Sequence, residues 1–260
     1  ARARNVSRII VGRPRPREML ASLFRESVTD ELIRRAEDGE PEGLAILARR
    51  QATGRGRSGR AWDSPPGNLY LSVLLRPSGP VREAAQWGLL AGVALVEAAR
   101  ELDPDPASLR LKWPNDLLRS GAKCAGILAE SSLAPGGGMA WLVLGFGVNL
   151  AAAPALPGRE TTTLGRAEPP ERFATRLLRR LDRWRAVQQG QGFAPVRAAW
   201  EAAGPAQGEA VLARVGTKFI AGDFAGLGKD GSLRLKTGHG LRSIAGGEVL
   251  DAATPAEEAS

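Results

Sequence analysis

The chain of 260 residues contains a single cysteine, Cys124, and a single histidine, His239. One cysteine excludes a disulfide within the chain, which fits a reducing cytoplasm. One cysteine and one histidine together also exclude a zinc site built from these residue types. Because His239 has no partner motif, the sequence argues against Ser-His-Asp catalysis. The chemistry of this chain must therefore depend on other side chains.

Long apolar runs and an N-terminal targeting pattern are also missing. No segment approaches the ~18 to 20 consecutive apolar residues that a membrane-spanning helix needs. The first residues carry charge with no apolar stretch behind them, so the sequence shows no signal peptide. We expect a cytoplasmic protein that has no membrane partner.

Basic residues outnumber acidic ones, with 36 Lys and Arg against 28 Asp and Glu, and the formal net charge is +8. Such an excess is typical of proteins that bind nucleic acid. Here the basic residues are spread along the whole chain, and arginine belongs to a composition that is also rich in alanine, glycine and proline. The charge alone therefore does not establish a nucleic-acid partner.

Apolar periodicity predicts an α+β fold with a mixed sheet, because strands and helices follow one another without a strict βαβ order. Strands are expected over 43–48, 68–75, 109–113, 125–130 and 141–149, and helices over 29–38, 81–102, 170–187 and 196–202. After Gly204 and Pro205 the pattern changes to short strands separated by glycine-rich turns, which is typical of a small β-barrel. We expect three segments: a basic lead-in over 1–20, a main domain over 21–204 and a small C-terminal barrel domain over 205–252.

The most informative segment is the loop Gly54–Arg60, in which glycines alternate with arginines. Glycine reaches positive φ without steric cost, and arginine offers a planar fork of donors that fits carboxylates and phosphates. Arg/Gly runs also occur in disordered segments that bind RNA, but this one is short and lies between two predicted strands. The pattern therefore favours an ordered loop that binds an anion.

Three further segments carry chemically useful side chains at strand ends. Lys112–Asp116 presents a cation, an indole, an amide and a carboxylate at a sharp turn, and Lys123 stands three residues before Gly126 at the mouth of an apolar strand. Gly145–Asn149 lacks the third glycine and the following helix of a dinucleotide fingerprint. Taken alone, each segment is better explained by structure: a Pro-Asn-Asp turn, a solvated edge lysine and a strand kinked by glycine.

Taken in order along the chain, these segments resemble the biotin protein ligases. The resemblance extends from about Ser27 to Leu250 and rests on Gly-Arg-Gly-Arg-x-Gly-Arg, Lys-Trp-Pro-Asn-Asp, Lys-Cys-Ala-Gly-Ile-Leu and Gly-Phe-Gly-Val-Asn. It implies a mixed-sheet catalytic domain of the biotin/lipoate ligase type over 21–204, followed by an SH3-like β-barrel. It also implies an ATP-dependent ligase that forms biotinyl-5′-AMP and passes biotin to one lysine of the biotin carboxyl carrier protein of acetyl-CoA carboxylase.

The resemblance also assigns residues to each part of this reaction. The biotin-binding residues that it implies are Ser27, Val28, Thr29, Gln51, Gly54, Arg55, Gly56, Arg57, Lys123 and Gly126. Those implied for ATP are Arg57, Arg60, Trp62, Lys112, Asn115 and Asn149, and those implied for catalysis are Arg57, Lys112, Asp116 and Lys123. Because two anions must meet in the first step, positioned cations are the main requirement. Mg²⁺ is expected to arrive on the nucleotide, without a His or Cys ligand.

The chain departs from the family at Val28 and Thr29. The family usually reads Ser-Thr-Asn where this chain reads Ser27-Val28-Thr29. Valine cannot donate a hydrogen bond to the ureido oxygen of biotin, and such a bond is worth about 0.5 to 1.5 kcal/mol net. We expect weaker binding of biotin unless Thr29 compensates.

Two other functions stay open at this point. A lipoate ligase or octanoyltransferase shares the fold, and a basic nucleic-acid-binding protein would use the Arg/Gly loop and show a steep salt dependence. The short lead-in leaves no room for a winged helix-turn-helix, so we expect a monofunctional ligase that binds no operator DNA. The sequence does not determine which protein is the carrier or what the oligomeric state is, a homodimer included.

Overall fold

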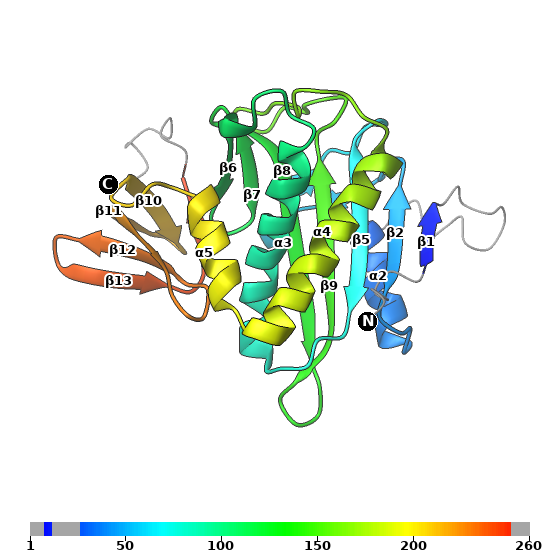
Figure 1. The fold of residues 1–260 in the computed structure, drawn as a ribbon, viewed down its shortest axis with the longest axis horizontal. Coiled ribbons are helices and arrows are strands. Elements are labelled where there is room, and N and C mark those ends of the chain that lie inside the picture. The colour runs from blue at the N-terminus through cyan, green and yellow to red at the C-terminus, as the bar shows by residue number, and fades with distance from the viewer. Residues whose placement is uncertain (1–7, 12–26, 251–260) are drawn as a thin grey trace.

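The computed structural model of the chain describes residues 8–11 and 27–250, and its centre is a seven-stranded sheet (Figure 1). In spatial order the strands are β1 (Arg8–Val11), β2 (Leu44–Ala48), β5 (Leu69–Leu75), β9 (Met139–Val148), β8 (Ala122–Leu133), β7 (Asp116–Arg119) and β6 (Leu109–Lys112). Only β1 and β2 pair in parallel, and the other neighbours are antiparallel. The predicted mixed sheet is confirmed.

Two of these strands correct the sequence analysis. β1 (Arg8–Val11) lies within the segment that was expected to be only a basic lead-in, and it pairs with β2 at the sheet edge. Arg-Ile-Ile-Val is rich in β-branched residues, which suit a strand even in an arginine-rich tract. β7 (Asp116–Arg119) was not predicted, because a strand of four residues has too little periodicity to be noticed. The rest of the segment 1–20 lies outside the described residues.

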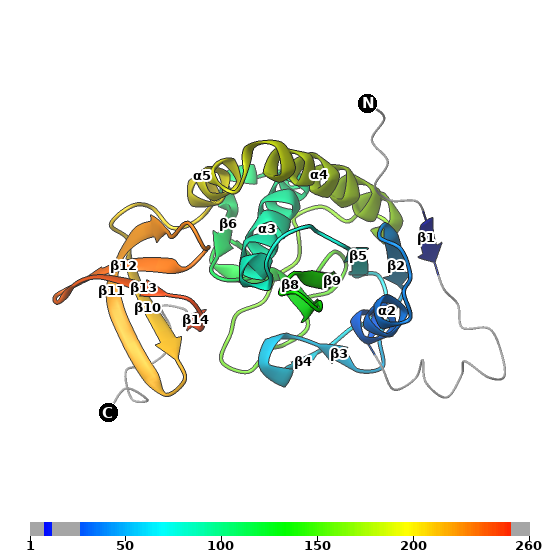
Figure 2. The ribbon, with the colours of Figure 1, turned by 90° about the horizontal axis from the view of Figure 1, so that it is seen from below.

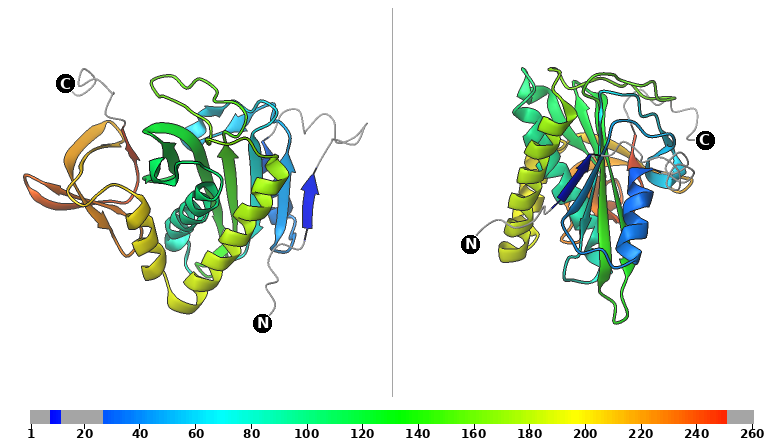
Figure 3. Two further views of the ribbon diagram at one scale, coloured as in Figure 1. Left: turned by 45° about the horizontal axis from the view of Figure 1, so that its top comes forward. Right: turned by 90° about the vertical axis from the view of Figure 1, so that its right-hand side faces the viewer.

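Helices cover both faces of the sheet (Figure 3). α3 (Ala84–Arg100), α4 (Pro170–Gln191) and α5 (Ala194–Ala203) lie on one face, and α2 (Val28–Glu37) lies on the other. The short 3₁₀ turns are η1 (Arg57–Gly59), η2 (Val81–Glu83) and η3 (Pro106–Ser108). All four predicted helices are confirmed, and none of the helices in the described part is both long and apolar enough to cross a membrane.

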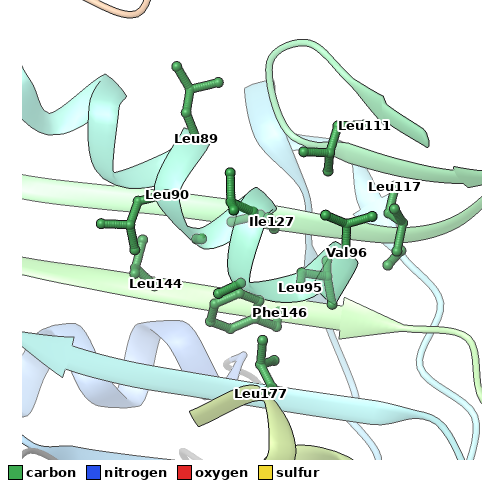
Figure 4. Close-up of a cluster of buried hydrophobic side chains, with 14 of the residues drawn as sticks. Leu89, Leu90, Leu95, Val96, Leu111, Leu117, Ile127, Leu144, Phe146 and Leu177 are labelled. Atoms are coloured by element: carbon green, nitrogen blue, oxygen red, sulfur yellow. The ribbon is translucent and has the colours of Figure 1, made fainter. Parts of the chain in front are cut away.

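The main core lies between α3 and the sheet. α3 is buried over most of its surface because it packs on the strands from one side and on α4 and α5 from the other. Figure 4 shows leucines of α3 against Ile127 of β8, Phe146 of β9 and Leu177 of α4. A smaller cluster around Leu32 and Trp141 fixes α2 on the opposite face. β9 contributes residues to both clusters and β8 to the main one, so both strands that carry functional residues are packed into the core.

The C-terminal region is a five-stranded antiparallel sheet at one end of the molecule (Figure 2). Its order is β13 (Gly240–Ile244), β12 (Leu233–Thr237), β11 (Lys218–Leu227), β10 (Ala210–Val215) and β14 (Glu248–Val249). Trp200 of α5 packs on Phe224 with ring centroids 6.4 Å apart, and Trp113 Nε1 donates to the carbonyl oxygen of Gly231 at 3.2 Å. These contacts join the sheet to the main core. An SH3-like closure of this sheet and the boundary at residue 205 stay predictions.

Candidate functional site

The four motif segments meet at one cavity of about 770 Å³. It lies between the Gly/Arg loop, the ends of the central strands β8 and β9, and the C-terminal sheet; Figure 2 shows β3 and β4 between α2 and that sheet. The predicted site residues that line it are Val28, Thr29, Gln51, Arg55, Gly56, Arg57, Arg60, Trp62, Asn115, Asp116, Lys123 and Gly126. Residues separated by nearly a hundred positions in the sequence therefore face a common space.

The Gly/Arg loop is a short ordered hairpin, as the sequence predicted. β3 (Gly54–Arg55) pairs with β4 (Ala61–Trp62), and η1 connects them. Ser58 and Gly59 take left-handed backbone angles, with φ of 56° and 73°. A Cβ atom on Gly54 would lie 2.2 Å from the carbonyl oxygen of Trp62, so only glycine fits there. The described geometry favours the anion-binding loop over a disordered Arg/Gly segment.

The three arginines of this loop have different partners. Arg55 pairs with Asp30 and with Glu130, whose Oε2 atom lies 3.0 Å from its guanidinium. Arg60 pairs with Glu248. Arg57 donates to the backbone oxygen of Gly247 at 3.2 Å and, within the described residues, to no carboxylate. Burial lowers the pKa of Arg57, against the opposing effect of nearby Asp116 and Glu248. A half-buried guanidinium without a carboxylate partner is suited to receive an anion.

A second cationic group surrounds Asp116. Its Oδ1 atom lies 2.6 Å from Lys123 Nζ, and its Oδ2 atom accepts a hydrogen bond from Arg159 at 2.8 Å. Lys123 Nζ also stands 5.2 Å from the ring centroid of Trp62, within the range of a cation–π contact. Lys123 and Arg159 thus hold the two oxygen atoms of one buried carboxylate at this corner of the cavity.

Glycines of β8 and β9 lie against the indole of Trp62. A Cβ atom on Gly147 would lie 2.7 Å from Trp62 Cε2, and one on Gly126 would lie 3.4 Å from both Lys123 Nζ and Trp62 Cζ3. Trp62 Nε1 is buried and has no hydrogen-bond partner in the described structure. Glycine at position 147 therefore leaves the space that the indole of Trp62 occupies against β9, whereas a Cβ atom at position 126 would make ordinary van der Waals contacts.

Hydroxyl and amide groups form another wall of the cavity. Thr29 Oγ1 and Ser72 Oγ are buried and share a hydrogen bond of 3.0 Å. The backbone N–H of Val28 donates to Gln51 Oε1 at 2.9 Å, and Gln51 Nε2 donates to Ser64 Oγ at 3.1 Å. This wall offers neutral polar groups, in contrast to the charged groups around Asp116.

Four predicted site residues lie outside the cavity lining. Ser27 caps α2, where its Oγ atom accepts a hydrogen bond from the backbone N–H of Asp30, and Gly54 packs beneath the loop. Lys112 is buried at the end of β6, and Asn149 Nδ2 donates to the carbonyl oxygen of Thr162 at 3.1 Å. These positions support the site from behind, because their side chains or backbone are already engaged in local packing.

Other residues of the cavity were missed by the sequence analysis. They are Ser72 of β5, Arg159 of the loop after β9, Arg214 of β10 and Gly247 and Glu248 near β14. None belongs to a recognisable local motif, and each reaches the site only through the tertiary fold. A search of the described residues finds no group of three or more His, Cys, Asp and Glu side chains that could hold a metal ion.

The sequence is similar to those of known ligases. The biotin/lipoate A/B protein ligase family matches residues 27–149, which include all four motif segments. The chain is 41% identical over 214 residues to the biotin–[acetyl-CoA-carboxylase] ligase of Paracoccus denitrificans, and the match covers 79% of this chain and 89% of that protein. It is 30% identical over 224 residues to the bifunctional ligase/repressor BirA of Bacillus subtilis, covering 82% of this chain and 68% of that protein.

A solved structure gives the same result for the fold. The biotin protein ligase from Aquifex aeolicus in complex with biotin and ATP superposes with a TM-score of 0.69 at 27% identity. The superposition covers 86% of this chain and 94% of that one. The similarity therefore includes most of both chains and not the central sheet alone.

Proposed function

The chain belongs to the biotin/lipoate A/B protein ligase family, and we propose that it is a biotin–[acetyl-CoA-carboxylase] ligase. It joins biotin to ATP as biotinyl-5′-AMP and then transfers the biotinyl group to a lysine of a carrier protein. The observation that carries this proposal is the cavity itself, whose lining combines Arg57 and Lys123 with neutral hydroxyl and amide groups. That arrangement suits a ligand with a polar neutral head and a carboxylate tail.

The first step brings two anions together. A carboxylate oxygen of biotin attacks the α-phosphorus of ATP, an oxygen–phosphorus bond forms, and pyrophosphate leaves. No side-chain nucleophile is needed, so catalysis depends on holding the reactants and on stabilising the charge that develops. Arg57 and Lys123 are proposed to hold the carboxylate and the phosphate, and Asp116 Oδ1 lies 2.6 Å from Lys123 Nζ.

The polar wall is proposed to bind the ureido ring of biotin. Thr29, Ser72 and Gln51 present hydroxyl and amide groups there, and Val28 supplies an apolar side chain beside them. Biotin in this orientation directs its carboxylate towards Arg57. Trp62 then packs on the adenylate, and closure of the loop protects the mixed anhydride from water.

The nucleotide is proposed to bring its own Mg²⁺. Both carboxylate oxygens of Asp116 are engaged, one by Lys123 and the other by Arg159, and Glu248 is paired with two arginines. Carboxylates held in this way are poor candidates for binding a metal ion, whereas the phosphates of ATP offer free oxygens. Asn149 is proposed to support ATP from behind the cavity and Asn115 from its lining, since each fixes a backbone carbonyl through its side-chain amide.

The second step transfers the acyl group. The ε-amine of the carrier lysine attacks the acyl carbon of biotinyl-5′-AMP, an amide bond forms, and AMP leaves with the electron pair of the broken carbon–oxygen bond. Asp116 lies between Lys123 and Arg159 and is proposed to orient the incoming amine. The partner is accordingly the biotin carboxyl carrier protein of a biotin-dependent carboxylase.

Pyrophosphate release with ATP, Mg²⁺ and biotin tests the proposal, with lipoate as the competing acid. We expect release that requires biotin, followed by modification of a carrier domain only when its acceptor lysine is present.

Arg57→Ala is expected to slow adenylate formation by about 10²- to 10³-fold, because one stabilising donor is lost in the transition state. Arg50→Ala is the matched control, since Arg50 is an exposed arginine that precedes the Gly/Arg loop and does not line the cavity. Release with lipoate alone would instead make this chain a lipoate ligase.

A further inference from the structure

A carboxylate bridge joins the Gly/Arg loop to the C-terminal sheet. Glu248 at the start of β14 pairs with Arg60 of the loop and with Arg214 of β10. All three residues line the cavity, and Arg57 reaches the same turn through the backbone oxygen of Gly247. The C-terminal sheet thus provides one wall of the site as well as packing against the core.

The charges in this corner are unequal. The carboxylate of Glu248 pairs with two guanidinium groups, those of Arg60 and Arg214, and Arg57 binds the backbone oxygen of the preceding residue, Gly247. The side chains of Arg60 and Arg214 are 51% and 39% exposed, whereas that of Glu248 is only 15% exposed. The carboxylate therefore lies beneath two cations that remain open to a ligand. An excess of positive charge in a cleft attracts a polyanion.

On the basis of the proposed function, we propose that Arg214 binds the leaving pyrophosphate portion of ATP and that Glu248 is the counterion that these phosphates displace. A phosphate group carries more charge than a carboxylate and accepts bidentate hydrogen bonds from guanidinium. Arg60 belongs to the Gly/Arg loop and Arg214 to β10 of the C-terminal sheet, so a ligand that bridges them also fixes the loop against that sheet. Glu248 keeps both arginines in position until the nucleotide arrives.

The ionisation of Glu248 agrees with this role. Burial alone would raise the pKa of Glu248, but hydrogen bonds from Arg60 and Arg214 outweigh burial and hold this pKa below its ordinary value. The carboxylate is therefore charged at neutral pH and competes with phosphate for the same donors. A simple structural salt bridge between β10 and β14 would have a different consequence, because loss of either partner would then weaken the site in the same direction.

Two variants of the full chain separate these explanations. Binding of inorganic tripolyphosphate would be measured by calorimetry in the absence of Mg²⁺, and KM for ATP and for biotin would be measured in pyrophosphate release. Arg214→Gln should weaken tripolyphosphate binding and raise KM for ATP by about tenfold, the loss of one charge-assisted contact. Glu248→Gln should strengthen tripolyphosphate binding by about threefold or more, because the competing negative charge is gone. KM for biotin should change less than twofold in both variants.

Arg110→Gln is the matched control. Arg110 also pairs with a glutamate of the C-terminal region, Glu209 at 2.6 Å, but it lies outside the cavity. This variant should leave both measurements unchanged. Arg214→Lys should keep most of the affinity for tripolyphosphate, which a position that only requires packing would not do.

The proposal is overturned if Arg214→Gln and Glu248→Gln weaken tripolyphosphate binding together, or if neither changes it. Circular dichroism spectra would establish that both variants are folded. The proposed function fails separately, when the unaltered chain releases no pyrophosphate with biotin. Calorimetry with tripolyphosphate requires no catalysis, so it tests the phosphate site in either case.

Discussion

At the scale of single residues, Val28 distinguishes this site most clearly. Its side chain lines the cavity, while its backbone N–H donates a hydrogen bond to Gln51 Oε1 at 2.9 Å. The neighbouring hydroxyls of Thr29 and Ser72 bond to each other at 3.0 Å. Each hydroxyl has one donor and two acceptor lone pairs, so after their mutual hydrogen bond one donor and several acceptors remain. These remaining groups are able to bind a ureido group even though residue 28 has no hydroxyl. We therefore propose that the buried hydroxyls of Thr29 and Ser72 take the role of the hydroxyl that Val28 lacks.

Val28→Thr tests this interpretation. The substitution adds one donor at nearly constant volume, and we expect the Kd for biotin to fall by about 2- to 10-fold, equivalent to about 0.5 to 1.5 kcal/mol. Titration calorimetry measures the change, and Val28→Ala serves as the control that alters packing without adding a hydroxyl. An unchanged Kd in Val28→Thr would mean that Thr29 and Ser72 already satisfy the ligand.

At the scale of secondary-structure elements, helix ends and strand ends position the site. α2 begins at a capping box in which Ser27 and Asp30 bond to each other's backbone N–H. This cap sets where α2 starts and therefore where Val28 and Thr29 enter the cavity. Asp30 also pairs with Arg55, so the helix start is connected to the Gly/Arg loop.

Ser27→Ala should destabilise the protein without weakening the site directly. Loss of the cap costs about 0.5 to 2 kcal/mol of unfolding free energy, whereas glycine at the same position costs only a few tenths. Urea denaturation of Ser27→Ala and Ser27→Gly measures this difference. The Kd for biotin should stay within about twofold of the parent value in both variants, since Ser27 is outside the cavity lining. A large rise in Kd in both would show that Ser27 contacts biotin after all.

α5 has a comparable role for the C-terminal sheet. Trp200 is only 1% exposed and packs between Gly92 of α3 and Phe224 of β11. Trp200→Ala should therefore cost about 3 to 5 kcal/mol of unfolding free energy, measured by urea denaturation. Because Arg214 and Glu248 belong to the sheet that this residue fixes, KM for ATP should rise more than KM for biotin. Trp200→Phe keeps an aromatic ring and should retain most of the stability; equal stability of the alanine variant would contradict the anchoring role.

At the scale of the whole molecule, buried or paired carboxylates connect distant segments. Burial alone would raise the pKa of Asp103, but Arg119 at 2.7 Å and the backbone N–H groups of Gly165 and Asp105, both at 2.9 Å, lower it overall. The pKa values of Glu209, Asp230 and Glu248 are lowered as well. These four groups lie in both the main sheet region and the C-terminal sheet. Acid is therefore expected to destabilise both the main sheet region and the C-terminal sheet.

The sign of the pH dependence follows from the lowered pKa values. A carboxyl with a lower pKa in the folded state stabilises the fold at pH values above its unfolded pKa of about 4. That stability is lost as the pH falls through the folded-state pKa. The unfolding free energy should thus be steady from pH 7 to about pH 5 and decrease below about pH 4.

Asp103→Asn should reduce stability at pH 7 by about 1 to 3 kcal/mol, because Arg119 and the backbone N–H of Gly165 lose a charged acceptor. It should also make the decrease in acid shallower. Urea midpoints measured from pH 7 to pH 3 test both expectations, with the exposed Asp223→Asn as control. An unaltered acid profile in Asp103→Asn would show that other carboxyls dominate.

The sequence by itself determined the elements and the chemistry of the motifs. Apolar periodicity located the helices and five of the seven strands of the central sheet, all except β1 and β7, since burial on one face or on both leaves a repeat that can be read locally. The alternation of glycine and arginine in Gly54–Arg60 predicted an ordered anion-binding loop, because φ preference and guanidinium geometry are properties of the residues themselves. The family resemblance rested on the same local patterns.

Only the tertiary structure decided which residues share the cavity. Ser72, Arg159, Arg214 and Glu248 come from separate elements, and no local spacing connects them to Arg57. It also placed Ser27 and Asn149 behind the site, where capping and a backbone contact engage them. Contacts across long sequence separations depend on how sheets and helices pack, so local patterns do not determine them. Sequence thus established the cations of the loop, and the packing of the C-terminal sheet established the carboxylate and the further arginine that surround them.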